Sequence, residues 1–111
     1  MMVRSRRCPL YVAGVGALLL LGAGPAAAAS HTYTVTIDKL KFGPLPANLH
    51  KGDTIVWVNR DMLRHTATAA NHSFDVDLPP GKKAATVLKT SGAIPFICRY
   101  HPGMRGVLHV K

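Results

Sequence analysis

The fold is decided by the stretch Lys51-Gly52-Asp53-Thr54-Ile55-Val56-Trp57-Val58-Asn59. Gly52 and Asp53 are typical of a tight turn, and the apolar and β-branched residues 54–58 after them favour a buried strand. We expect Trp57 in the core, with an exposed recognition side chain as the alternative. Similar short segments separated by turn residues recur along the chain at roughly ten-residue spacing, and a sustained helical period of apolar residues is absent.

The segments on either side of this strand extend the same pattern. The other predicted strands are residues 32–37, 66–69, 83–88, 94–98 and 105–110. Residues 40–49 contain two prolines and are expected to form an edge segment, whereas residues 71–80 are expected to be irregular. Seven or so short strands in a chain of 111 residues predict one domain, an all-β antiparallel sandwich.

The first 29 residues are predicted to be a cleaved signal peptide. Three arginines at positions 4 to 7 precede a short apolar stretch, and small residues follow up to Ala29. The apolar stretch is shorter than the roughly 20 residues of a membrane-spanning helix, and glycines interrupt it. Cleavage after Ala29 or Ser30 leaves a mature domain of residues 30–111 that we expect in the periplasm, without stable membrane insertion. The arginine pair partly matches a twin-arginine export signal.

The charge of the mature domain is moderate. Without the three leader arginines, 11 Lys and Arg remain against five Asp, so the formal charge falls from +9 to +6. These basic residues are scattered and do not alternate with aromatic side chains, which argues against nucleic-acid binding. We expect the charge to attract an acidic protein partner over long range.

A single cysteine, Cys98, remains after removal of the leader, so a disulfide within the domain is excluded. An odd cysteine in an exported protein indicates an intermolecular bridge, a reactive thiol or a metal ligand. The neighbours of Cys98 favour the last of these. His101 and Met104 follow at three-residue steps, in a loop that Pro102 and Gly103 can bend. Thiolate, imidazole and thioether donors select copper over magnesium, calcium or manganese.

His65 supplies the fourth predicted ligand. It follows the strand that ends near Asn59, and it is itself followed by a strand-like segment. Two histidines and one cysteine with a weak axial methionine form the ligand set of blue-copper electron-transfer sites. We expect electrons to pass through His101. Because this set leaves no open position for a substrate, it indicates a carrier rather than an enzyme.

These residues make the mature chain resemble a cupredoxin, a type 1 blue copper protein, with the greatest similarity to the amicyanins and less to plastocyanins and pseudoazurins. The similarity covers residues 33–111, and its most specific parts are residues 51–54, 57–60, 80–81 and 98–107. The resemblance implies a Greek-key sandwich of seven or eight strands that binds one copper ion. The copper ligands that it implies are His65, Cys98, His101 and Met104.

The resemblance also assigns Asn59 to a supporting role, in which it ties the His65 segment to the cysteine loop. It implies a monomer that exchanges electrons with a dehydrogenase or a cytochrome. In the amicyanins the surface around the exposed ligand histidine is apolar. This chain differs, because arginines adjoin three of its four predicted ligands. We therefore expect Arg64, Arg99 and Arg105 to form a cationic rim around His101 that selects a partner with an acidic docking surface.

Two alternative functions remain open from the sequence. A copper storage or delivery protein could use the same ligands, although such proteins tend to have exposed sites rich in methionine and histidine. A second alternative is a copper site formed by the terminal amine and ring of His31, if cleavage follows Ser30. We expect His50, His72 and His109 to be solvated and not to bind metal.

Overall fold

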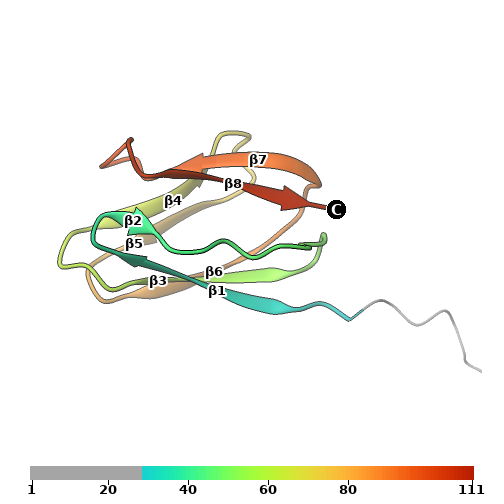
Figure 1. Ribbon diagram of the computed structural model, residues 1–111, viewed down its shortest axis with the longest axis horizontal. Coiled ribbons are helices and arrows are strands. Elements are labelled where there is room, and N and C mark those ends of the chain that lie inside the picture. The colour runs from blue at the N-terminus through green and yellow to red at the C-terminus, as the bar shows by residue number, and fades with distance from the viewer. Residues whose placement is uncertain (1–28) are drawn as a thin grey trace, which may run out of the picture.

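The computed structural model describes residues 29–111 as two four-stranded sheets packed face to face (Figure 1). The strands are β1 Thr32–Asp38, β2 Lys41–Phe42, β3 Thr54–Asn59, β4 His65–Ala69, β5 Asp75–Leu78, β6 Lys83–Val87, β7 Gly92–Ile97 and β8 Arg105–Val110. One sheet has the order β2-β1-β3-β6 and the other β5-β4-β7-β8. The predicted signal peptide, apart from Ala29, lies outside the described residues. None of the described residues forms a helix long and apolar enough to cross a membrane.

The predicted all-β sandwich is confirmed, but it is not wholly antiparallel. β1 and β3 run parallel, with Thr32 opposite Thr54 and Val35 opposite Trp57, whereas every other pair of named strands is antiparallel. Parallel neighbours need a connection of a dozen residues or more. The segment that carries β2 and the two prolines is long enough to return the chain to the starting end of β1.

The prediction that residues 71–80 are irregular is wrong, because this segment contains β5. Its side chains alternate between Asp75 and Asp77, which are exposed, and Val76 and Leu78, which point inward. β5 pairs antiparallel with β4, so that Leu78 lies opposite His65. The alternation is that of a half-buried strand, and the neighbouring turn residues obscured it in the sequence.

An aromatic cluster fills the space between the sheets. Trp57 is fully buried, and its ring centroid lies 5.2 Å from that of Phe96 and 5.8 Å from that of Phe74. Phe42 packs edge-on against Phe96 with centroids 4.8 Å apart. The indole Nε1 of Trp57 donates to the hydroxyl of Thr86 at 3.2 Å. The prediction of a core tryptophan is confirmed, and the exposed alternative is wrong.

Gly106 leaves room for this cluster, and we expect Gly106→Ala to destabilise the fold. A Cβ at this position would lie 2.6 Å from Cζ of Phe96, whose ring is held by its aromatic neighbours. Overpacking of a filled core costs about 1–3 kcal/mol, so urea denaturation of the copper-free variant should show a lower midpoint. Gly103→Ala is the matched control, because its Cβ would meet no atom within 4 Å. Equal midpoints for the two variants would contradict the expected clash.

Candidate metal centre

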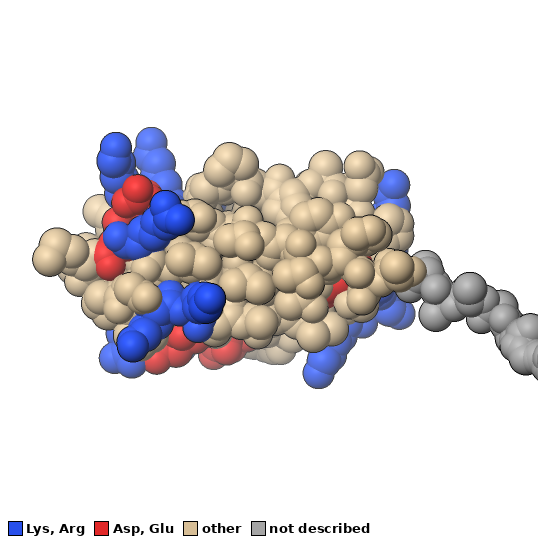
Figure 2. All heavy atoms as spheres, turned by 90° about the horizontal axis from the view of Figure 1, so that it is seen from below, with Lys and Arg blue, Asp and Glu red and all other residues tan. Residues whose placement is uncertain are grey.

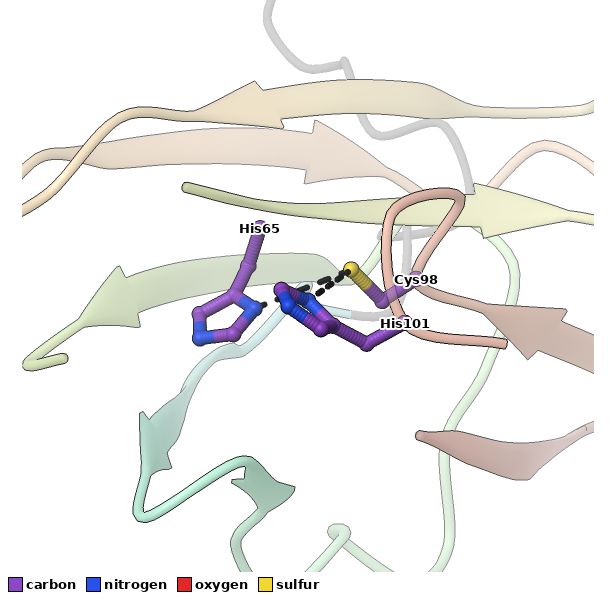
Figure 3. A group of neighbouring side chains, drawn as sticks. All are labelled: His65, Cys98 and His101. Carbon is purple, nitrogen blue, oxygen red and sulfur yellow. Dashed lines mark hydrogen bonds between the residues drawn. The ribbon is translucent and has the colours of Figure 1, made fainter. Parts of the chain in front are cut away.

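Three of the predicted ligands meet at one end of the sandwich (Figure 3). Nδ1 of His65 and Nδ1 of His101 each lie 3.7 Å from Sγ of Cys98. The three donor atoms all lie within 4.8 Å of one another. We call these three residues the ligand cluster. The sequence prediction that they converge is confirmed.

The strands and one short loop position this cluster. His65 is the first residue of β4, Cys98 directly follows β7, and these strands are neighbours in one sheet. Three backbone hydrogen bonds close the loop between β7 and β8: Cys98 N to Met104 O at 3.0 Å, Met104 N to His101 O at 2.8 Å, and His101 N to Cys98 O at 3.3 Å. The tight loop predicted from Pro102 and Gly103 therefore turns His101 back toward Cys98.

Burial separates His101 from the other donors. Cys98 and His65 are 0% exposed, whereas His101 is half-buried. Met104 ends the same loop and is 5% exposed, with its side chain among the core residues. The ring of His101 lies with its centroid 5.0 Å from that of His65. Within the cluster, His101 is thus the residue through which solvent or another protein can make contact.

The donor atoms fit a single soft or borderline metal ion. Metal–nitrogen bonds of about 2.0–2.1 Å and metal–sulfur bonds of about 2.3 Å, meeting at trigonal or tetrahedral angles, place nitrogen and sulfur about 3.6–3.8 Å apart. The measured separations of 3.7 Å agree with this value. A thiolate with two imidazoles suits copper or zinc, and a nearby thioether favours copper.

Thr66 joins the His65 strand to the cysteine loop. Its backbone N–H donates to Sγ of Cys98 at 3.4 Å, and its hydroxyl accepts from the backbone N–H of Arg99 at 2.8 Å. Thr66 is fully buried, and its hydroxyl also lies 3.0 Å from that of Thr68. A hydrogen bond to a ligand sulfur orients that ligand and tunes the metal. The sequence analysis did not predict this linking role for Thr66. Its position as a polar residue directly after a predicted ligand could have indicated it.

The role predicted for Asn59 is wrong. Its Nδ2 donates to the carbonyls of Leu63 at 2.7 Å and Leu78 at 2.9 Å, and its Oδ1 accepts from the backbone N–H of Asp61 at 2.8 Å. Within residues 29–111, no hydrogen bond joins Asn59 to the cysteine loop. Asn59 lies at the end of β3, so it shapes the turn that leads to His65, and Thr66 makes the link that was assigned to it.

Asp61 was also missed by the sequence reading. Its Oδ2 lies 2.7 Å from Nε2 of His65, four residues along the chain. Burial of this carboxyl raises its pKa, but hydrogen bonds from Leu40 N–H, the His65 ring and Lys39 N–H outweigh that effect and hold the pKa of Asp61 below its ordinary value. Asp61 is therefore an ionised acceptor at neutral pH.

The expected cationic rim is largely neutralised. Arg64 forms a two-point ion pair with Asp77, at 2.7 and 3.0 Å, and Arg99 lies 3.4 Å from Asp75. The hydrogen bond from Arg64 lowers the pKa of Asp77. In Figure 2, acidic and basic side chains mix at the left end of the domain. Among residues 29–111, Arg105 has no ion pair, so it is the ligand-adjacent arginine with a free charge.

The remaining histidines lie away from the cluster. His31 directly precedes β1, which begins at the end of the sandwich away from the loop between β7 and β8 (Figure 1). Its backbone N–H donates to Oδ1 of Asp53 at 2.9 Å. The alternative copper site formed by the terminal amine and ring of His31 would need this same nitrogen. His50, His72 and His109 are exposed, as expected.

Residues 11–110 match the family model of the cupredoxin-like domain, so the chain belongs to the cupredoxin-like family. No curated protein sequence matches it significantly. Among solved structures, an amicyanin mutant in its reduced Cu(I) form at pH 4 shares 26% identity, covering 78% of this chain and 85% of that one with a TM-score of 0.58. Amicyanin from Paracoccus versutus shares 22% identity over 78% of this chain and 85% of that one, with a TM-score of 0.60.

A purple cupredoxin from Nitrosopumilus maritimus shares 22% identity, covering 70% of this chain and 98% of that one with a TM-score of 0.61. At these identities the likenesses concern the fold. They confirm the predicted resemblance to cupredoxins and to amicyanin among them.

Thr66→Val should destabilise the protein, because valine has the same shape but cannot accept the hydrogen bond from Arg99 N–H. An unsatisfied and partly buried donor costs about 1–3 kcal/mol, which urea denaturation of the copper-free protein would measure. Thr34→Val, at an exposed position of β1, is the matched control and should leave the midpoint nearly unchanged. If the two variants unfold alike, the Thr66 hydroxyl does not hold the loop.

Proposed function

We propose that this protein is a mononuclear type 1 copper protein that carries single electrons in the periplasm. The observation that carries the proposal is the ligand cluster, two imidazole nitrogens and one thiolate sulfur within 4.8 Å of one another. Bound copper would supply one-electron chemistry between Cu(I) and Cu(II). The chain supplies the binding, the orientation and the exclusion of water.

Each ligand has a distinct proposed role. Cys98 is the thiolate donor, His65 the buried imidazole, and Met104 the weak axial donor that tunes the reduction potential. Strands β4 and β7 and the closed loop between β7 and β8 hold these donors on stiff elements. A site that rearranges little between two oxidation states lowers the energetic cost of each electron transfer.

Burial supports a carrier over a storage protein or an enzyme. Cys98 and His65 have no solvent-exposed surface, so release of a metal would require the loop to open. His101 is the half-buried member of the cluster, and we propose that electrons enter and leave through its outer edge. The four donors leave no position for a substrate.

The localisation and partners are part of the same proposal. Residues 1–29 have the layout of a cleaved signal peptide, which would direct residues 30–111 to the periplasm. We propose that the domain acts there as a monomer. The partners are a dehydrogenase or a cytochrome, and the free charge of Arg105 beside Met104 favours an acidic docking surface.

Cys98→Ser should abolish the intense blue absorption of the Cu(II) form, because a hydroxyl cannot provide thiolate-to-copper charge transfer. The experiment is an optical and electron paramagnetic resonance spectrum of the copper-loaded wild type and variant. Circular dichroism of the variant should still show a folded β domain, since serine fits the space of cysteine. A wild type that binds Cu(II) without an intense visible band, or a blue Cys98→Ser variant, would exclude a type 1 site.

Arg105→Glu should slow electron transfer with an acidic cytochrome at low ionic strength. The Debye length shrinks from about 30 Å at 0.01 M salt to about 8 Å at 0.15 M, so the wild-type rate should fall with salt and approach that of the variant. Stopped-flow measurements give both second-order rates. Lys51→Glu makes the same charge change beside the C-terminal Lys111, whose carbonyl accepts from the backbone N–H of Lys51. The C-terminus lies at the end of the sandwich away from the loop between β7 and β8 (Figure 1), so this substitution should matter less. Equal effects of the two substitutions would show that Arg105 does not select the partner.

A further inference from the structure

We propose that Asp61 is a positioning residue for the ligand histidine His65, and that its charge lowers the reduction potential of the site. The inference rests on the proposed copper site and deepens it. The Asp61 carboxylate lies outside the ligand cluster. Neither the spacing of the predicted ligands nor the resemblance to other proteins gave it a role.

The contact between Asp61 and His65 fixes both the tautomer and the direction of the imidazole. Both oxygens of Asp61 already accept from backbone N–H groups, as an ionised carboxylate does, so Nε2 of His65 is the donor in the 2.7 Å hydrogen bond to Oδ2. In the neutral imidazole, Nδ1 then carries no proton and can bind metal. This is the nitrogen that faces Sγ of Cys98 at 3.7 Å. The unprotonated nitrogen therefore already points toward the place where a metal would bind.

Asp61 is itself held from two sides. Its Oδ1 accepts from the backbone N–H of Lys39 at 2.7 Å, and its Oδ2 accepts from that of Leu40 at 2.9 Å. Its own backbone N–H donates to Oδ1 of Asn59 at 2.8 Å. These contacts leave the carboxylate little freedom to turn away from His65.

The turn that binds Asp61 has an uncommon backbone. Lys39 and Leu40 form the two-residue connection between β1 and β2, with φ angles of 53° and 60°. Left-handed residues other than glycine cost about 1 kcal/mol or more each. The two N–H groups of this turn converge on Asp61, which offsets part of that cost. The turn, the carboxylate and the buried ligand therefore form one connected unit.

The charge of Asp61 is placed to act on the site. Its side chain is 13% exposed, and among residues 29–111 no lysine or arginine forms an ion pair with it. Asp75 and Asp77, by contrast, are about half exposed and paired with arginines. A poorly screened negative charge one imidazole away from a metal favours its more positive oxidation state. Asp61 should accordingly stabilise Cu(II) over Cu(I).

Asp61→Asn tests this inference, because asparagine keeps the shape and an acceptor oxygen but removes the charge. Voltammetry of the copper-loaded variant should show reduction favoured about tenfold over the wild type, which is 59 mV for one electron. Asp38→Asn is the matched control, since Asp38 lies next to the same turn with its side chain exposed to water. A potential that shifts no more in Asp61→Asn than in Asp38→Asn would overturn the proposed effect of charge.

A second measurement does not depend on a variant or on copper. Nitrogen-15 NMR of the copper-free wild type at pH 8 should show His65 with its proton on Nε2, slow to exchange because of the hydrogen bond. A proton on Nδ1 would overturn the positioning role. A wild type without blue colour would refute the proposed function, and the tautomer of His65 would still decide whether Asp61 orients this ring.

Discussion

Two hydrogen bonds made by Thr66 connect the parts of the molecule that must not move apart. Its N–H reaches the sulfur of Cys98, and its hydroxyl receives the next backbone N–H, that of Arg99. β4 and β7 have only two residue pairs in register, Thr68 with Ile97 and Ala69 with Phe96. The ladder between the strands therefore ends before the ligands, and Thr66 continues it through side-chain contacts. The ligand cluster depends on this extension.

The hydrophobic core supports the cluster from below. Phe96 lies on β7, two residues before Cys98, and packs against Trp57 from the other sheet. Cys98 and Met104 belong to the same group of buried residues as these rings. Since interiors are close-packed, a displacement of the cysteine would require the aromatic cluster to move as well. The rigidity that the proposed electron transfer requires thus comes from core packing as well as from loop hydrogen bonds.

The sequence was informative wherever a pattern is local. The alternation in β1 and the β-branched run of β3 predicted these strands correctly. The spacing from Cys98 to His101 predicted two side chains that the fold brings together with His65. That these residues and Met104 bind copper stays a prediction. The parallel pairing of β1 with β3 depends on how far the chain travels between them, which no local period encodes. Thr66 and Asp61 gain their roles from partners that only the folded chain brings near. The role of Asn59 was assigned by resemblance, and its side chain instead stabilises the turn between β3 and His65.

His65 and His101 differ in burial, and this difference would limit when the protein can meet each of its proposed redox partners. With His65 enclosed and His101 half-buried, the proposed exchange of electrons through His101 would bring a donor and an acceptor to the same small area of surface. The two partners could then not be bound together, and each cycle would consist of two separate encounters. Turnover under these conditions depends on fast dissociation, so a compact, weakly held contact serves the protein better than a tight complex.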